Sequence, residues 1–303
     1  MSATEKRKKI KELLKEKNAI LLAHYYQRDE IQDIADILGD SLALSIEAAR
    51  TDADIIVFAG VLFMAESAAI LSPDKTVPLP VLDAGCPLAD KITAAELNTI
   101  KDENPGARVV TYVNSSAQTK ALSDICCTSA NAVQVVNSLT DAETVIMAPD
   151  GNLARYTARF TDKKIIPWKG FCYVHDNLSP EAVRKVRDEH PKALFVAHPE
   201  CRLEVLDLAD FVGSTGAILE FARETDAGEI IVGTEKGIMH QLKKKRKKKT
   251  FIPASETMVC QDMKKISLDD ILSSLEEMKH IIEVPEDVRI PAQRALKKML
   301  EIS

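Results

Sequence analysis

The sequence contains little glycine, proline or aromatic residue and no long apolar run. Only 11 of its 303 residues are Gly, 13 are Pro and 5% are aromatic, which excludes collagen-like and low-complexity disordered proteins. No apolar stretch reaches the roughly 18 residues that a membrane-spanning helix needs. The charged start of the chain also lacks the apolar centre of a secretory signal. We therefore expect a cytoplasmic protein that does not bind a membrane.

Disulfide scaffolds and zinc-finger patterns are also missing. The six cysteines include no CxxC pair, and in a reducing compartment cysteines serve metal binding, reactivity or packing. The net charge of −6 offers no electrostatic footprint for nucleic acid. The basic run Lys243 to Lys249 is a local exception, which we expect to be a solvated surface loop. With 46% hydrophobic residues the chain can bury a sizeable core, and its length alone suggests about two domains.

One pattern of elements occurs three times along the chain. Short apolar strands that end in a polar aromatic residue begin at residues 19, 107 and 193, which are 88 and 86 residues apart. In each unit a hydroxyl-rich turn, a second buried strand, a helical stretch, a third strand and a cysteine follow. Amphipathic helices precede the units at about 5–17, 94–104 and 180–190, and a further one spans about 267–279. Strands that alternate with helices in this way are typical of parallel sheets covered on both faces.

This period predicts three α/β/α sandwich domains with parallel sheets, related by pseudo-threefold symmetry, with the active site at their junction. We expect the domains to span 1–104, 105–190 and 191–303, the last one including the C-terminal helices. A single doubly wound domain with a smaller second domain is the alternative.

Three cysteines occupy equivalent positions in the repeat. Cys86, Cys172 and Cys260 each follow the third strand of their unit, and loops at the carboxyl ends of parallel strands line the ligand crevice. Three thiolates could therefore meet at one metal centre with an open position. Zinc is possible, but structural zinc usually takes four ligands, whereas soft thiolates from distant loops also suit a cubane iron–sulfur cluster. Packing is the alternative role, and it is the one that we expect for the other three cysteines.

Further polar side chains fall on the same loops. They comprise His24, Tyr112, Asn114, His198 and Glu200, with the hydroxyls of Ser41, Ser129 and Thr215. Donors at helix starts favour anions, so we expect a small polyanionic substrate such as a dicarboxylate or a phosphate ester. The hydroxyl residues could also simply be helix N-caps. Tyr26 and Glu200 are the candidates for acid and base, and we count His198 with them as catalytic.

A series of motifs carries a family resemblance across nearly the whole chain. In order, the motifs are HYY, EIQDIAD, GDSL, FAGVLFMAE, YVNS, TSANA, PDGNLA, GFCYVH, HPEC, GSTG and MVCQDMK. Together they resemble the quinolinate synthase family, the A protein of bacterial and archaeal NAD biosynthesis. The chain lacks the CxxCxxC cluster that some members have near the position of Cys260.

The resemblance implies a transferase that condenses iminoaspartate (iminosuccinate) with dihydroxyacetone phosphate to give quinolinate, phosphate and water. It implies a [4Fe-4S] cluster held by Cys86, Cys172 and Cys260, with the fourth iron open to substrate. The eight polar residues named above match the substrate-binding positions of the family, and Tyr26 matches its catalytic tyrosine. The implied functional partner is the enzyme that supplies iminoaspartate, an L-aspartate oxidase or dehydrogenase.

Two other functions stay open at this point. One is an iron–sulfur hydro-lyase that acts on another small hydroxy acid. The other is a scaffold or nucleic-acid-binding protein that uses the basic run, with all its cysteines packed in cores.

Overall fold

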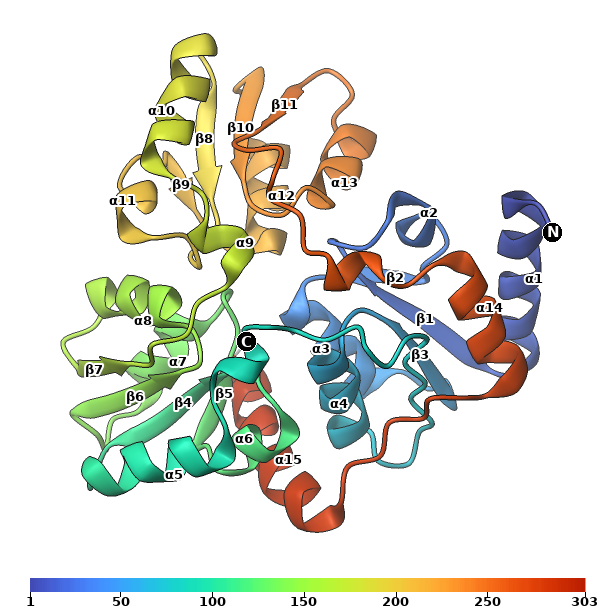
Figure 1. The fold of residues 1–303 in the computed structure, drawn as a ribbon, viewed down its shortest axis with the longest axis horizontal. Coiled ribbons are helices and arrows are strands. Elements are labelled where there is room, and N and C mark those ends of the chain that lie inside the picture. The colour runs from blue at the N-terminus through green and yellow to red at the C-terminus, as the bar shows by residue number, and fades with distance from the viewer. Residues whose placement is uncertain (303) are drawn as a thin grey trace.

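Each sequence repeat forms its own parallel sheet, and the three sheets surround a common centre (Figure 1). The computed structural model describes residues 1–302. Helices pack against the strands of each sheet. The predicted α/β architecture with three parallel sheets is confirmed.

The strand order and the flanking helices are similar in the three units. The first sheet has the order β2-β1-β3 and comprises β1 (Ala19–His24), β2 (Ile37–Gly39) and β3 (Ile55–Ala59), with helices α1 (Ala3–Glu16), α2 (Asp29–Gln32), α3 (Ser41–Arg50) and α4 (Leu62–Leu71). The second has the order β5-β4-β6-β7 and comprises β4 (Arg108–Tyr112), β5 (Ile125–Cys127), β6 (Thr144–Ala148) and β7 (Lys164–Pro167), with α5 (Ala94–Glu103), α6 (Ala117–Ala121), α7 (Ala132–Ser138) and α8 (Gly151–Thr157). The third has the order β11-β10-β8-β9 and comprises β8 (Leu194–Ala197), β9 (Phe211–Val212), β10 (Glu229–Gly233) and β11 (Thr250–Pro253), with α9 (Tyr173–Asp176), α10 (Pro180–Glu189), α11 (Leu203–Leu206), α12 (Thr215–Glu224) and α13 (Ile238–Lys245).

The first unit differs from the other two at its outer edge. The expected third strand at 77–80 runs alongside β3, where Ile56 N–H donates to Thr76 O at 2.9 Å and Phe58 N–H donates to Pro78 O at 3.1 Å. It is not a regular strand, because Pro78 and Pro80 have no N–H to donate. In the second and third units the equivalent segments form β7 and β11.

Capping residues begin the amphipathic helices that the sequence predicts. Capping boxes centred on Ser2, Thr93 and Ser267 open α1, α5 and the later helix α14 (Leu268–Glu277). Ser179 caps α10, which has Pro180 in its first turn. These side chains satisfy main-chain N–H groups that the first helical turn leaves unpaired. The four predicted helices are confirmed.

After the third sheet the chain returns to the first two units. Helix α14 packs against α1, and α15 (Glu286–Glu301) packs against α6, β5 and α4 (Figure 1). The C-terminal helices therefore cover the first and second units. The domain boundaries stay a prediction.

The apolar core is continuous between the units. One cluster of buried side chains includes Leu22 of β1, Val110 of β4 and Val232 of β10. The three units thus pack directly on one another, and their strand ends have fixed relative positions. No helix in residues 1–302 has the length and apolar character needed to cross a membrane.

The basic run is part helix and part turn at the surface. Lys243 to Lys245 form the last turn of α13, where positive side chains interact favourably with the helix dipole. Lys244 pairs with Asp33 at 2.7 Å, and Lys249 donates to Ala222 O at 3.0 Å. The expected surface position is confirmed, although the first three residues belong to the helix and not to a loop.

Candidate active site

One pocket at the centre of the three units contains all the residues that the sequence singles out. The twelve predicted site residues line this pocket: His24, Tyr26, Ser41, Cys86, Tyr112, Asn114, Ser129, Cys172, His198, Glu200, Thr215 and Cys260. They follow the carboxyl ends of strands in all three sheets, which the fold directs toward a common centre. The structure brings these residues together, while their individual roles stay predictions.

Three half-buried cysteines reach the pocket from separate loops. Cys86 precedes the short 3-10 helix η1 (Ala89–Lys91), Cys172 is the N-cap of α9, and Cys260 precedes η3 (Asp262–Lys264). The other three cysteines, Cys126, Cys127 and Cys201, are fully buried within apolar clusters. The expected packing role of these three is confirmed.

The cysteine thiols of the pocket lie in surroundings that disfavour the free thiolate. Burial, together with the nearby Cys260, raises the pKa of Cys86 to about 12. Burial also raises the pKa of Cys172 and Cys260. A metal centre requires thiolate ligands and supplies the positive charge that stabilises them. The donor set of three convergent thiols therefore fits a thiophilic metal centre.

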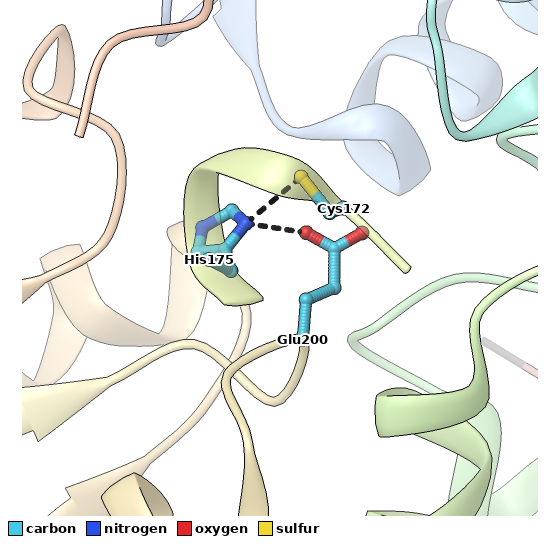
Figure 2. A group of neighbouring side chains, drawn as sticks. All are labelled: Cys172, His175 and Glu200. Atoms are coloured by element: carbon cyan, nitrogen blue, oxygen red, sulfur yellow. Dashed lines mark hydrogen bonds and ion pairs between the residues drawn. The ribbon is translucent and has the colours of Figure 1, made fainter. Parts of the chain in front are cut away.

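A second group of potential ligands includes Cys172 (Figure 2). His175 Nδ1 lies 3.3 Å from Cys172 Sγ and 2.8 Å from Glu200 Oε2. The ligand atoms of Cys172, His175 and Glu200 all lie within 4.8 Å of one another, so these side chains could hold a metal ion. The Nε2 atom of His175 lies 2.8 Å from Thr234 Oγ1, which fixes the ring orientation.

Glu200 is a buried carboxylate with unused hydrogen-bonding capacity. Within residues 1–302 its Oε1 atom has no hydrogen-bond partner, and its main-chain oxygen accepts a hydrogen bond from Asn152 Nδ2 at 3.1 Å. Burial acts to raise the pKa of Glu200, but the adjacent His175 and the hydrogen bonds from His175 and Tyr112 outweigh it, so the pKa lies below the ordinary value. Glu200 is therefore ionised at neutral pH, with one oxygen free for a ligand.

Tyr26 joins the first unit to the third. Its hydroxyl lies 2.7 Å from Thr215 Oγ1 and 2.6 Å from Thr234 Oγ1. Burial raises the pKa of Tyr26 well above its ordinary value, so the hydroxyl keeps its proton. The side chain is thus a rigidly held hydrogen-bond donor and potential acid.

The two histidines at strand ends are neutral at physiological pH. Burial lowers the pKa of His24 to about 4 and that of His198 to about 3. His24 Nδ1 accepts a hydrogen bond from Tyr26 N–H at 3.1 Å, which leaves its Nε2–H as the donor. Both rings can therefore bind an oxyanion as neutral hydrogen-bond donors only.

The hydroxyl groups of Ser41, Ser129 and Thr215 do not act as helix N-caps. Ser41 and Thr215 are the first residues of α3 and α12, whose N-caps are Asp40 and Ser214. Ser129 lies in the turn ahead of α7, which begins at residue 132 with a different N-cap. The expectation of a helix start is confirmed for Ser41 and Thr215 and is wrong for Ser129, because the turn before α7 is longer. The alternative that these hydroxyls are N-caps is excluded.

Comparison with known proteins assigns the family. The family model described as "Quinolinate synthetase A protein" matches residues 8–301. The chain belongs to this family. It is 58% identical over 302 residues to "Quinolinate synthase" of Geotalea uraniireducens, covering 100% of this chain and 99% of the relative. It is also 55% identical over 295 residues to "Quinolinate synthase 1" of Methanosarcina acetivorans, covering 97% of each. The predicted family resemblance is confirmed.

Several pocket residues of this quinolinate synthetase A family member were missed by the sequence reasoning. They are Asp40, His175 and Glu235 in the pocket wall, with Asp150 directly behind it. His175 could have been found, because it follows Cys172 by three residues and so lies on the same helical turn. Asp150 and Glu235 could have been found from the repeat, because each lies two residues beyond the second buried strand of its unit, whereas Asp40 carries no such signal.

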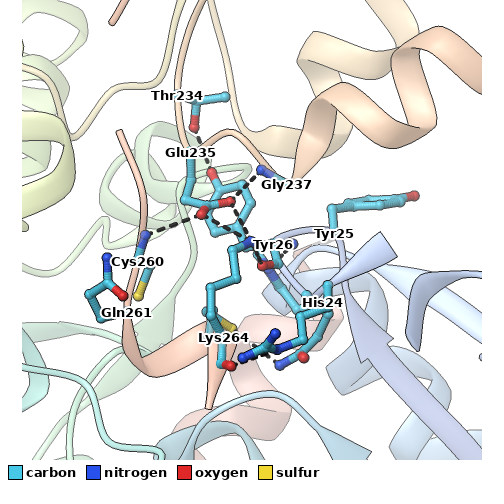
Figure 3. A network of polar contacts seen from close by, with 12 residues as sticks. His24, Tyr25, Tyr26, Thr234, Glu235, Gly237, Cys260, Gln261 and Lys264 are labelled. Carbon is cyan, nitrogen blue, oxygen red and sulfur yellow. Dashed lines mark hydrogen bonds and ion pairs between the residues drawn. The ribbon is translucent and has the colours of Figure 1, made fainter. Parts of the chain in front are cut away.

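Lys264 is the cation that lies close to this site. Its ammonium group lies 3.1 Å from Glu235 Oε1 and also donates to the main-chain oxygen of Tyr26 (Figure 3). This network ties the loop of Cys260 to the strand end that carries Tyr26 and His24.

Proposed function

We propose that this protein is a quinolinate synthase of NAD biosynthesis that condenses iminoaspartate with dihydroxyacetone phosphate. The products are quinolinate, one phosphate and two waters, which balances the atoms of both substrates. The observation that supports this most is the single pocket in which three thiols and an array of hydrogen-bond donors from all three units converge. The transferase class follows from the same reaction.

Cys86, Cys172 and Cys260 are the residues that would hold a [4Fe-4S] cluster. Three protein thiolates leave one iron for substrate, and such an iron supplies Lewis-acid polarisation of a carboxylate or hydroxyl oxygen. The position of these three thiols in one pocket supports this assignment, because the other three cysteines lie in apolar clusters away from it.

The remaining residues bind the substrates and move protons. His24 and His198 donate hydrogen bonds to carboxylate or phosphate oxygens, as do Asn114 and the hydroxyls of Ser41, Ser129, Tyr112 and Thr215. Glu200 is ionised and accepts protons from substrate carbon atoms. Tyr26 keeps its proton and donates it to a leaving oxygen, since two threonine hydroxyls hold it in place.

The cellular location and the source of the substrate follow from the same function. The protein works in the cytoplasm and receives iminoaspartate from an L-aspartate oxidase or dehydrogenase. That substrate is a dicarboxylate, which agrees with the neutral donors and the two helix starts that line part of the pocket.

Anaerobic reconstitution tests this function. The chain is treated with iron and sulfide, and iron content and quinolinate formation are measured with an L-aspartate oxidase as the source of iminoaspartate. We expect about four irons per chain and quinolinate formation that requires dihydroxyacetone phosphate. Cys86→Ala, Cys172→Ala and Cys260→Ala should each lose the four-iron spectrum and activity, whereas the buried control Cys126→Ala should keep both.

The outcomes separate the parts of the proposal. A chain that takes up four irons but forms no quinolinate would contradict the substrates and favour a hydro-lyase. A chain that binds one metal ion instead would contradict the cluster. Retention of the four-iron spectrum in one cysteine variant would remove that cysteine from the ligand set.

A further inference from the structure

The three units share an equivalent sequence position just after their second core strand. It lies two residues beyond the end of β3, β6 and β10 and is occupied by Val61, Asp150 and Glu235. Two of the three units thus carry a carboxylate at this position. Both carboxylates are buried, with exposed fractions of 2% for Asp150 and 0% for Glu235.

Asp150 connects a helix start to a cysteine of the pocket. Its Oδ2 atom accepts a hydrogen bond from the main-chain N–H of Cys172 at 3.2 Å. Its Oδ1 atom accepts one from Leu153 N–H at 2.8 Å, which caps α8. One side chain therefore fixes the loop of Cys172 relative to the second sheet.

Glu235 makes the same connection in the third unit (Figure 3). Its Oε1 atom accepts a hydrogen bond from the main-chain N–H of Cys260 at 3.1 Å. Its Oε2 atom accepts one from Gly237 N–H at 2.6 Å, and Lys264 lies 3.1 Å from Oε1. Cys260 lies outside helices and strands, so this carboxylate supplies a main-chain partner that regular structure does not.

The first unit holds its loop in another way. Val61 has no acceptor in its side chain, and the next residue, Leu62, donates its N–H to Ala84 O at 2.8 Å. Ala84 lies two residues before Cys86. A main-chain hydrogen bond thus anchors this loop close to the cysteine.

We propose that Asp150 and Glu235 are positioning residues for the metal centre, holding the main chain of Cys172 and Cys260 so that both thiols face the shared pocket. This rests on the proposed cluster. Burying a carboxylate is costly unless its oxygens are hydrogen-bonded, and here the bonds connect to the two cysteine loops. Groups that orient metal ligands in this way typically change metal affinity by about 10- to 100-fold when mutated.

Near-isosteric variants test the proposal. Asp150→Asn and Glu235→Gln each keep only one acceptor oxygen, so the side chain can no longer accept from both of the main-chain N–H groups that the carboxylate binds. Asp150→Ser removes the contact with Cys172 while keeping a residue that caps α8 well. This variant separates positioning from helix capping.

The repeat offers matched controls at the opposite ends of the sheets. Asp124 Oδ2 accepts a hydrogen bond from Val109 N–H at 2.7 Å, and Asp210 Oδ2 accepts one from Phe195 N–H at 2.7 Å. Asp124→Asn and Asp210→Asn therefore make the same chemical change to the same kind of contact near the beginnings of β4 and β8, away from the cysteines.

After anaerobic reconstitution we measure the iron and sulfide content, the iron–thiolate absorption and the rate of iron release to a chelator. The unfolding midpoint of each metal-free chain is measured separately. We expect the three variants to release iron about 10- to 100-fold faster than wild type, with the controls matching wild type. Iron release at the wild-type rate would overturn the inference. A faster release that merely follows a lowered midpoint, in controls and variants alike, would also overturn it. A wild-type chain that takes up no cluster would instead refute the proposed function itself.

Discussion

Burial sets the charge of the side chains that face the pocket. His24 and His198 are neutral because burial lowers the pKa of both rings, whereas Glu200 is ionised beside two imidazoles. The polar wall thus contributes negative charge even though an anionic substrate is proposed. Positive potential comes from the amino ends of α3 and α12 and from Lys264.

Glu200→Gln should separate catalysis from cluster assembly. The amide keeps the size of the side chain but cannot accept a proton, so turnover should fall by about 100- to 10,000-fold while the iron content stays unchanged. Quinolinate formation and iron analysis measure the two effects. The exposed residue Glu204 on α11 provides the control Glu204→Gln. Near-normal turnover of Glu200→Gln would rule out its role as the base.

The buried ring of His24 should make the metal-free chain sensitive to mild acid. Its pKa is lowered from 6.5 to about 4 on folding, so the unfolded chain binds the extra proton first as the pH falls. The stabilising contribution is therefore complete above pH 6.5 and is lost as the pH falls toward 4. Between pH 7 and pH 5 the wild type should lose about 2 kcal/mol more unfolding free energy than His24→Gln. Urea unfolding at both pH values measures this, and an equal loss in both chains would contradict the assignment.

At the scale of elements, helix starts connect the units as well as line the pocket. Asp40 caps α3 by accepting from Ala43 N–H at 3.1 Å, and it also accepts from Ser214 Oγ at 3.1 Å and from Gly216 N–H at 3.2 Å on α12. A Cβ atom at Gly216 would lie 2.8 Å from Asp40 Oδ2, so only glycine allows this approach. One carboxylate therefore aligns two helix starts from different units.

Asp40→Ala should cost more stability than the loss of a cap alone. Removing the cap costs about 1 kcal/mol, and leaving the partners on α12 unpaired should bring the total to about 2–3 kcal/mol. The control Thr93→Ala removes a capping box that stays within α5 and should cost about 1 kcal/mol. Denaturant unfolding compares the two variants, and equal losses would show that the contact between α3 and α12 contributes nothing.

At the scale of the whole molecule, the last helix binds two units together. Helix α15 lies between α4 of the first unit and α6 and β5 of the second, and Leu296 on it is fully buried. The C-terminal segment thus completes cores that begin about 200 residues earlier in sequence, which a low cost of long loop closure permits.

Leu296→Ala should destabilise the protein by about 2–5 kcal/mol, because it leaves a cavity in this shared core. Ile290 lies on the same helix with 40% of its surface exposed, and Ile290→Ala should change the free energy of unfolding by less than about 1 kcal/mol. Thermal or urea unfolding of the metal-free chains checks both values. A small effect of Leu296→Ala would mean that α15 adds little to the folded core.

The sequence by itself determined the three repeated units, their parallel strands and the group of twelve residues at the strand ends. It could do so because a strand's carboxyl end, a helix cap and a buried apolar run are local features, and their regular spacing assigns equivalent places to Cys86, Cys172 and Cys260. The proline-interrupted edge at 77–80 shows the limit of that regularity, since one unit can lose a strand while keeping its place in the fold.

Only the tertiary structure decided which side chains hold the pocket together. Asp40 meets a residue 174 positions away, Tyr26 meets one 189 positions away, and α15 returns to the first two units. Asp150 and Glu235 likewise act through the main chain of residues 22 and 25 positions later. The pattern along the chain does not specify such contacts, because they depend on how three separately patterned sheets pack around one centre.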